Sequence, residues 1–295
     1  MTVRIADLPR VRSRHPEAVA EAAARRARRP LLGDSGRLMI IAADHTARGA
    51  LGVGGRDLAM ANRADLLERL CLALSRPGVD GVLATADILD DLLLLGALEN
   101  KVVMGSMNRG GLFGASFEMD DRFTGPRADD IVRRGFDAGK LLLRIDYDDP
   151  GSLTTMESAA RAIDAMAAHR LPVFVEPFLS RRVDGRVRND LSAEAVTTSI
   201  AIASGLGATS AYTWLKVPVT DDAADMARVM ESSTLPAVLL GGDIGDGPER
   251  QEAAYERWRA ALRLPTVQGL VVGRALLYPS DGDVAAAVDT AVGLL

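Results

Sequence analysis

The strongest constraint on the fold is a series of eight short apolar runs separated by segments with helical periodicity. The runs cover residues 37–44, 80–85, 101–106, 140–146, 171–177, 211–218, 235–242 and 269–274. Strands this uniformly apolar are covered on both faces, which is typical of a parallel sheet. Amphipathic segments lie between them, for example 63–75, 127–139, 156–170 and 221–233. Strand and helix alternating eight times predict an α/β protein built as a single (β/α)8 TIM barrel.

A doubly wound open sheet is the alternative fold. It usually has fewer strands and carries a glycine-rich turn after the first strand. The glycines of "ARGALGVGG" follow the first run here but lack a G-x-G-x-x-G at the right point, so their fit to a dinucleotide fingerprint is weak. Barrels of this kind commonly run to about 250 residues as one domain. We therefore expect the barrel over residues 31–295.

Residues 1–30 differ from the rest in composition. They are rich in alanine and arginine, with eight arginines against three acidic residues. We expect an N-terminal helical extension that covers one end of the barrel, ends at Pro30 and exposes its basic face to solvent.

Composition limits the classes of partner. The net charge of −5 and a pI near 5.4 argue against a nucleic-acid surface. No run approaches the roughly 18 apolar residues that a membrane span needs. Cys71 is the single cysteine, so no intramolecular disulfide forms, and its leucine-rich surroundings predict a buried, inert thiol. We expect a cytoplasmic protein without nucleic-acid or membrane partners.

Lys216 is one of only three lysines in a chain with 32 arginines, so a lysine at this strand end is unusual. In a barrel, active sites lie at the C-terminal ends of the strands. Strand alternation puts Lys216 on one face with Tyr212 and Trp214, which we expect to point into the barrel. Burial lowers the pKa of an ammonium group, and the neutral amine can form a Schiff base with a carbonyl, as arginine cannot. The alternative is a lysine that extends to solvent from the strand end.

Glu176 follows the fifth run and shares its face with Pro172 and Phe174. We expect burial to raise the pKa of its carboxyl, which would suit it to transfer protons near neutral pH. The alternative is a glutamate paired with an arginine at the rim.

Two further charged residues follow the same logic. Asp44 ends the first run. It could accept a hydrogen bond from a substrate hydroxyl group, orient the Lys216 amine, or cap the N-terminus of the following segment. Lys140 opens the fourth run and shares parity with Arg144. Lys140 is therefore either an interior cation or a surface residue, and Arg144 competes with it for the interior position.

Glycines at the last two strand ends predict an anion site. Loops after strands seven and eight of such barrels often bind phosphate through backbone N–H groups. Gly241 and Gly242 follow the seventh run, and Gly273 and Arg274 follow the eighth. The glycines would let the backbone approach the phosphate, and Arg274 would add a cation; the alternative is a pair of tight turns.

No metal site is expected. The three histidines lie far apart, at 15, 45 and 169, and only His45 is well placed at a strand end. A divalent-metal-dependent lyase centred on Asp44 and His45 is the alternative enzyme class, but no further ligand set accompanies the pair. The chain also lacks a G-x-S-x-G nucleophile elbow and a P-loop. We therefore expect chemistry without a metal or cofactor.

Residues 37–280 resemble the class I, Schiff-base aldolases, most closely the tagatose-1,6-bisphosphate and sulfofructosephosphate aldolases, with the archaeal-type fructose-bisphosphate aldolases more distant. The matching motifs are "AADHTARGAL", "KLLLRIDYDDP", "VFVEPFL", "WLKVPV" and "VVGRAL". The resemblance implies a Schiff base at Lys216, proton transfer by Glu176, supporting charges at Lys140 and Asp44, and phosphate binding by Gly273 and Arg274.

Two departures bear on the substrate. The third run ends in "SMNRGG", without the acidic residue of the tagatose enzymes, and the archaeal-type tyrosine after the fifth strand is missing, although Tyr147 could replace it. The chain also resembles actinobacterial aldolase-like barrels linked to myo-inositol catabolism. That resemblance implies cleavage of 5-dehydro-2-deoxy-phosphogluconate to dihydroxyacetone phosphate and malonate semialdehyde, with Arg109, Arg144 or Arg48 holding the carboxylate.

Other aldolase activities and a non-catalytic role stay open at this stage. The other activities are those of deoxyribose-phosphate, tagatose- or fructose-bisphosphate and sulfofructosephosphate aldolases, and the non-enzymatic reading is an aldolase-like barrel that acts as a binding partner. We expect a phosphorylated small-molecule substrate and a homo-oligomer.

Overall fold

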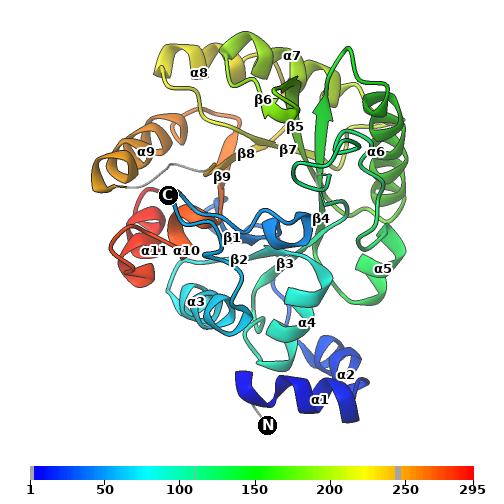
Figure 1. Ribbon diagram of the computed structural model, residues 1–295, viewed down its shortest axis with the longest axis vertical. Coiled ribbons are helices and arrows are strands. Elements are labelled where there is room, and N and C mark those ends of the chain that lie inside the picture. Colours follow the sequence, from blue (N-terminus) through cyan, green and yellow to red (C-terminus); the bar gives the residue numbers. More distant parts are fainter. Residues whose placement is uncertain (1–2, 110, 243–246) are drawn as a thin grey trace.

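Eight parallel strands close into a barrel surrounded by helices (Figure 1). This computed structural model describes residues 3–109, 111–242 and 247–295. The barrel strands pair in the order β1, β2, β3, β4, β5, β7, β8 and β9, and β9 pairs with β1 to close the ring. Their bounds are β1 Leu38–Ala43, β2 Gly81–Ala84, β3 Val102–Ser106, β4 Ala138–Ile145, β5 Val173–Val183, β7 Thr213–Val217, β8 Ala237–Leu240 and β9 Val267–Val272. Each predicted run overlaps one of these strands, although β4, β5 and β9 extend beyond the predicted bounds. The closed ring confirms the TIM barrel and excludes the open sheet.

The helices pack around the outside of the barrel. The predicted helix at 63–75 coincides with α3, whereas α5 is shorter than predicted because β4 already begins at Ala138. The bounds are α3 Arg63–Ser75, α4 Ala86–Leu94, α5 Ala128–Arg133, α6 Gly151–Ala168, α7 Ala193–Ser204, α8 Ala223–Met230, α9 Pro248–Ala261, α10 Arg274–Leu277 and α11 Val284–Val292. A 3₁₀ helix, η2 (His45–Arg48), follows β1. Within the described ranges, no helix combines the length and apolarity that crossing a bilayer requires.

Alternation along each strand divides the apolar side chains between two cores. Met39 and Ile41 of β1 face outward and pack with the helices, whereas Leu38 and Ile40 face inward. Leu83, Val102, Met104, Phe174, Val238 and Val271 belong to the same inner cluster. The Trp214 ring packs against it, with its centroid 5.1 Å from that of Phe174. Lys216 therefore also faces the barrel interior, because it lies two residues beyond Trp214 on the same face of β7.

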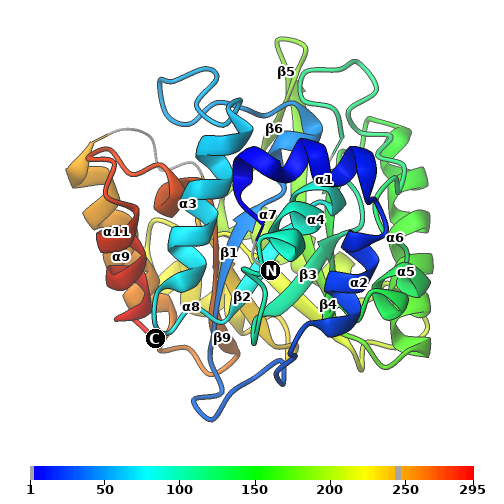
Figure 2. The same cartoon turned by 90° about the horizontal axis from the view of Figure 1, so that it is seen from below.

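The N-terminal extension differs from the prediction of one helix ending at Pro30. It contains a 3₁₀ turn, η1 (Ile5–Asp7), and two short helices, α1 (Leu8–Arg14) and α2 (Ala18–Arg25). Pro16 separates the helices, because the residue before a proline is disfavoured in the helical region. Both helices lie on the outside of the barrel near α4 rather than across its end (Figure 2). The basic side chains are also not all solvated, since the Arg12 guanidinium contacts Asp91 on α4.

The segment after α2 closes the N-terminal end of the barrel. Leu31 and Leu32 pack against the inner apolar cluster. Arg26 is buried and donates hydrogen bonds to the carbonyls of Lys101 and Gly135 and to the Asp137 carboxylate. An irregular segment therefore covers the N-terminal end of the barrel, and the cavity described below lies at the opposite end.

A hairpin that the sequence analysis missed projects beyond the barrel at the opposite end. Strand β5 continues past the barrel to Val183 and pairs antiparallel with β6 (Arg186–Asn189). Asp184 and Gly185 form the turn, both with positive φ. Figure 2 shows the tip of this hairpin rising at the same end as the loops after β1 and β3. An Asp-Gly pair between two strand-like segments is a strong hairpin signal, so the sequence "RRVDGRVRN" was sufficient to predict this hairpin.

Candidate active site

A cavity of about 400 Å³ opens at the C-terminal ends of the strands. Loops after β1 and β3 and the β5–β6 hairpin form its upper walls, through residues such as Arg48, Phe113 and Val187. Among the described residues, the cavity lining has seven cationic side chains and three carboxylates; the cations are Arg48, Arg109, Arg144, Arg188, Arg274, Lys140 and Lys216, and the carboxylates are Asp44, Glu118 and Glu176. In a chain with a net charge of −5, this excess of cations is local, and it predicts an anionic ligand.

Four charged side chains from four strands meet at the base of the cavity. Lys216 Nζ on β7 donates a hydrogen bond to Glu176 Oε1 on β5 at 2.7 Å. Lys140 Nζ on β4 lies 2.6 Å from Glu176 Oε2 and 2.9 Å from Asp44 Oδ2, at the end of β1. All four side chains are buried. The structure therefore brings together the four residues that the sequence analysis selected as catalytic candidates, in the order Lys216, Glu176, Lys140, Asp44.

Burial and the two lysines act in opposite directions on Glu176. Burial by itself raises the pKa of a carboxyl group, which was the basis of the sequence prediction. Here the neighbouring charges of Lys140 and Lys216 outweigh burial and lower the pKa of Glu176 to about 2. The prediction of a raised pKa was therefore wrong. The same reversal holds at Asp44, where burial is opposed chiefly by the charge of Lys140 and the pKa of the carboxyl falls.

The two lysines differ in their electrostatic environment. Burial lowers the pKa of Lys216, and the charge of Lys140 adds to the effect, while Glu176 opposes both. At Lys140, burial is outweighed by the Asp44 and Glu176 carboxylates, and the pKa of this ammonium rises. Lys216 is therefore the amine of the pair that more readily loses its proton, and Lys140 the one that keeps its charge. The lowered pKa of Lys216 agrees with the direction predicted from its position.

Lys140 and Arg144, the two residues of β4 that were candidates for the interior cation, both line the cavity but at different depths. Lys140 lies among the carboxylates at the base, whereas Arg144, four residues further along β4, contacts Glu118. Arg48 Nη1 lies 4.0 Å from the same Glu118 oxygen. Arg109, after β3, also lines the cavity. Lys140 is thus the cation next to Lys216, and the arginines form a separate group nearer the mouth.

The predicted phosphate loops border the other side of the cavity. Gly241, Gly242, Gly273 and Arg274 all line it. A Cβ atom on Gly273 would lie 2.2 Å from the carbonyl oxygen of Ala42, so only glycine fits there without moving the backbone. Gly242 has a φ of +64°, in the left-handed region that favours glycine. The backbone geometry at these two strand ends therefore favours glycine independently of any ligand.

The described residues provide no third metal ligand beside Asp44 and His45. Across 3–109, 111–242 and 247–295, no three His, Cys, Asp or Glu side chains are grouped to hold an ion. Asp44 is bonded to Lys140 and accepts a hydrogen bond from Ser106 Oγ at 3.2 Å. His45 Nδ1 lies 3.7 Å from Asp44, and burial, together with Arg274 and Arg48, lowers the pKa of His45 to about 3 despite the opposing charge of Asp44. His45 is therefore a neutral imidazole in the cavity wall.

Some cavity residues were not found from the sequence, and one candidate lies elsewhere. Tyr147 is 73% exposed and does not line the cavity, so it does not replace the missing tyrosine. Glu118, Val187, Arg188 and Asn189 line the cavity and were missed. The hairpin residues follow from the Asp-Gly turn, but Glu118 lies in a long loop with no periodicity to indicate its direction. After β3, the Asn108 side chain forms hydrogen bonds with the backbone of Leu142 and does not line the cavity.

The fold and the site together define a (β/α)8 barrel with a buried cluster of two lysines and two carboxylates at the base of its cavity. The chain belongs to the Cgl0159-like family, whose sequence profile matches residues 36–292. It is similar to Cgl0159 from Corynebacterium glutamicum, with 57% identity over 97% of this chain and 95% of that one, and a TM-score of 0.93. No curated protein matches the sequence.

Solved aldolases share the fold at low sequence identity. A Schiff-base-forming fructose-1,6-bisphosphate aldolase is 19% identical over 94% of this chain and 99% of its own, with a TM-score of 0.64. An archaeal fructose-1,6-bisphosphate aldolase is 18% identical over 93% and 99%, with a TM-score of 0.63. At this identity the likeness concerns the fold alone.

Proposed function

We propose that this protein is a class I aldolase, a carbon–carbon lyase in which Lys216 forms a Schiff base with the carbonyl group of a phosphorylated keto-sugar or keto-sugar acid. The observation that carries the proposal is the buried contact of 2.7 Å between Lys216 Nζ and Glu176 Oε1 at the base of the cavity. An amine of lowered pKa beside a proton acceptor has both properties that a Schiff-base nucleophile needs. The fold shared with Schiff-base-forming aldolases supports the same chemistry.

The first half of the reaction forms the covalent link. Lys216 passes a proton to Glu176, and its lone pair attacks the carbonyl carbon of the substrate. The carbonyl π pair moves to oxygen, and one proton passes from the attacking nitrogen to that oxygen to give the neutral carbinolamine. Glu176 returns its proton to the departing hydroxyl group, which leaves as water, and the nitrogen lone pair completes a protonated C=N bond. Glu176 is positioned for this exchange because its two oxygens contact the two lysines, and the loss of charge at Lys216 removes one of the two charges that lower the pKa of Glu176.

The second half cleaves the carbon–carbon bond. Glu176 removes the proton from the hydroxyl group on the carbon β to the imine, and an aldehyde product forms there. The electron pair of the broken bond moves into the C=N⁺ group to give an enamine. Protonation of the enamine carbon and addition of water then release the second product and regenerate Lys216. Lys140, which keeps its charge and is itself held by Asp44, positions Glu176 and offsets its negative charge during these transfers.

The surroundings of the lysine support an anionic substrate. Arg274 and the backbone at Gly241 and Gly273 would bind a phosphate group on the β8–β9 side. Arg109 or Arg144 on the β3–β4 side would bind a second anionic group. A sugar acid phosphate such as 5-dehydro-2-deoxy-phosphogluconate has this charge pattern, as do keto-sugar bisphosphates and sulfofructose phosphate.

Covalent trapping with borohydride tests the proposal. Reduction of the Schiff base in the presence of substrate should attach the ketone fragment to Lys216. Mapping is simple, because the other two lysines, Lys101 and Lys140, lie in well-separated parts of the sequence. Lys216→Met should abolish both the adduct and the cleavage activity. Labelling at Lys140, or full activity of the methionine variant, would refute the proposal.

The substrate is found by testing phosphorylated sugars and sugar acids as a panel. Release of a triose phosphate, measured with a coupled dehydrogenase, would identify the compounds that are cleaved. Retention of activity with a chelator would further separate this mechanism from a metal-dependent lyase at Asp44 and His45.

A further inference from the structure

Three arginines besides Arg188 and Arg274 line the cavity, in the segments at the ends of β1, β3 and β4. Arg48 ends η2, Arg109 follows β3, and Arg144 lies near the end of β4. In the ring of eight strands, β4 and β9 occupy opposite positions. We call Arg48, Arg109 and Arg144 the arginine cluster.

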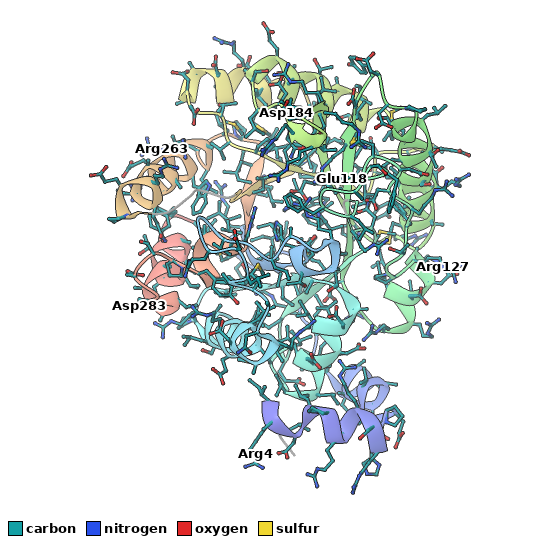
Figure 3. All side chains as sticks on the ribbon, viewed as in Figure 1. Arg4, Glu118, Arg127, Asp184, Arg263 and Asp283 are labelled. Atoms are coloured by element: carbon teal, nitrogen blue, oxygen red, sulfur yellow. The ribbon has the colours of Figure 1, made fainter. Side chains whose placement is uncertain are left out.

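Glu118 is the carboxylate of this cluster. The other two carboxylates in the cavity lining, Asp44 and Glu176, are bonded to lysines at the base. Glu118 is only 3% exposed. Its Oε1 contacts the Arg144 guanidinium and lies 4.0 Å from Arg48 Nη1, and its Oε2 accepts a hydrogen bond from the Gly114 N–H at 3.0 Å. Figure 3 labels Glu118 on the β4–β5 side in the view along the barrel.

The loop after β3 is built closely around Glu118. A Cβ atom on Gly111 would lie 2.1 Å from the Glu118 carbonyl oxygen and 2.8 Å from its Cγ. The φ of Gly111 is +75°, which favours glycine as well. The backbone at Gly111 thus packs closely against Glu118 and holds its side chain in one position beside the arginines.

Charge in the cluster is not balanced by the described residues. The Glu118 carboxylate lies against the guanidinium groups of Arg144 and Arg48, while Arg109 lines the same cavity. Three buried nitrogens of these arginines, Arg48 Nη1, Arg109 Nε and Arg144 Nε, make no hydrogen bond to any described residue. Buried cationic groups without partners are costly, and an oxyacid anion supplies the missing acceptors.

We propose that Glu118 is a specificity-determining residue, an internal counter-ion that occupies part of an anion subsite formed by Arg48, Arg109 and Arg144. It thereby limits how much negative charge the substrate can bring to this side of the cavity. The inference rests on the proposed function only in taking this cavity as the substrate site. The ligand group is a carboxylate or a phosphate, which share the bidentate oxygen geometry that guanidinium groups bind.

The physical consequence concerns the charge of the ligand. Glu118 repels any anion that approaches the same guanidinium groups, and the repulsion on a dianion is twice that on a monoanion. Replacing Glu118 with the neutral glutamine removes this repulsion and retains an oxygen to accept the Gly114 N–H. The variant should therefore bind dianions more tightly and should gain less for monoanions.

Calorimetric titration of the full chain with inorganic phosphate and with acetate tests this inference. Both the reference protein and its variants carry Arg274→Gln, which weakens anion binding on the β8–β9 side. At pH 8, where phosphate is mostly a dianion, Glu118→Gln should tighten phosphate binding roughly tenfold or more, because a like charge a few ångströms away is removed. Acetate should tighten by a smaller factor. Adding Arg144→Gln to the glutamine variant should cancel the gain.

The matched control is Asp120→Asn. Asp120 lies on the same loop but pairs with the exposed Arg122, so its neutralisation should leave phosphate binding within about twofold. Unchanged or weaker phosphate binding in Glu118→Gln would overturn the proposal, as would an equal gain in Asp120→Asn.

Two further measurements keep the inference separate from folding and from the proposed chemistry. Arg48→Gln alone should weaken phosphate binding, and unchanged binding would overturn the subsite even if Glu118→Gln failed to fold. The same titrations in Lys216→Met should give the same shifts, because no Schiff base is involved. A failure of covalent trapping at Lys216 would therefore not affect the phosphate-binding result. Likewise, unchanged phosphate binding in Glu118→Gln would not affect the Schiff-base proposal.

Discussion

Lys216 and Glu176, 40 positions apart in the sequence, form a buried hydrogen bond of 2.7 Å between neighbouring strands of the barrel. Lys140 contacts the other oxygen of the same carboxylate at 2.6 Å. One carboxylate thus bridges two ammonium groups of unequal pKa, lowered at Lys216 and raised at Lys140. The arrangement separates an amine that can lose its proton from a cation that stays charged, and the following predictions depend on it.

Neutralising the bridge should reduce turnover and change its dependence on pH. In Glu176→Gln the proton acceptor of Lys216 is lost, and we expect kcat to fall by about 10² to 10⁴, the usual contribution of a positioned acid–base group. The charge of Glu176 opposes the lowered pKa of Lys216, so its loss should shift that pKa further down. The measurement is kcat against pH for cleavage of a substrate found by the panel.

Glu157→Gln is the matched control, because Glu157 pairs with Arg161 on the exposed face of α6. It should retain full turnover. A Glu176→Gln enzyme with unchanged kcat and an unchanged pH profile would contradict the role of the bridge.

Stability against acid should depend on the same carboxylate. The pKa of Glu176 is about 2 in the folded protein against an ordinary value of 4.5, so the unfolded chain binds the proton more tightly. Its contribution is complete above pH 4.5 and is lost as the pH falls toward 2, and it corresponds to about 3 kcal/mol in the free energy of unfolding. Asp44, whose pKa is also lowered, adds a loss in the same direction.

Urea unfolding at pH values between 2 and 7 measures this effect. The free energy of unfolding should fall steeply below pH 4.5 in the natural protein and less steeply in Glu176→Gln. Curves of equal slope for the two proteins would show that Glu176 does not carry the effect.

A methyl group at Gly273 should disturb the loop after β9. Its Cβ would lie 2.2 Å from the carbonyl oxygen of Ala42, and that backbone atom can move only with β1. We expect Gly273→Ala to lower the free energy of unfolding by about 1–3 kcal/mol, as overpacking in a core does. If the loop binds phosphate, the variant should also raise the KM for a phosphorylated substrate about tenfold or more.

Gly205→Ala provides the comparison. Gly205 is exposed after α7, and the nearest atom to an added Cβ lies 3.6 Å away. Its substitution should stay within about 0.5 kcal/mol of the natural protein, as is usual at surface positions. Equal effects of the two alanines in urea unfolding would exclude a specific role for the Gly273 contact.

The segment that covers the N-terminal end of the barrel should contribute to stability and not to catalysis. The Arg26 side chain is 1% exposed and lies 3.2 Å from the Asp137 carboxylate. Arg26→Met removes one partner of a buried pair, and we expect a loss of about 3 kcal/mol in the free energy of unfolding. Because Arg26 lies at the end of the barrel opposite the cavity, kcat and KM should not change.

The neighbouring Arg25→Met is the control, since the Arg25 side chain is 68% exposed. Its free energy of unfolding should differ from that of the natural protein by no more than about 0.5 kcal/mol. Loss of activity in Arg26→Met under conditions where the variant is fully folded would contradict the separation of the two ends.

Local pattern was sufficient for the barrel and for the direction of its interior side chains. Period-two alternation placed Trp214 and Lys216 on the inner face of β7, and Phe174 and Glu176 on that of β5, as the structure has them. The hairpin at Asp184 and Gly185 was also encoded locally, although it was not predicted. These features depend on neighbours in the sequence, because strand geometry fixes the direction of each side chain from the one before it.

Only the tertiary structure decided the charges of the site. Burial alone predicted a raised pKa for Glu176, and contact with Lys140 and Lys216 reversed it. In the same way, the loop after β3 brings Glu118 to Arg144, 26 positions away, and no sequence pattern predicted that contact. Electrostatic energy depends on the distance between groups in space, and that distance is set by the closure of the barrel rather than by the spacing of residues along the chain.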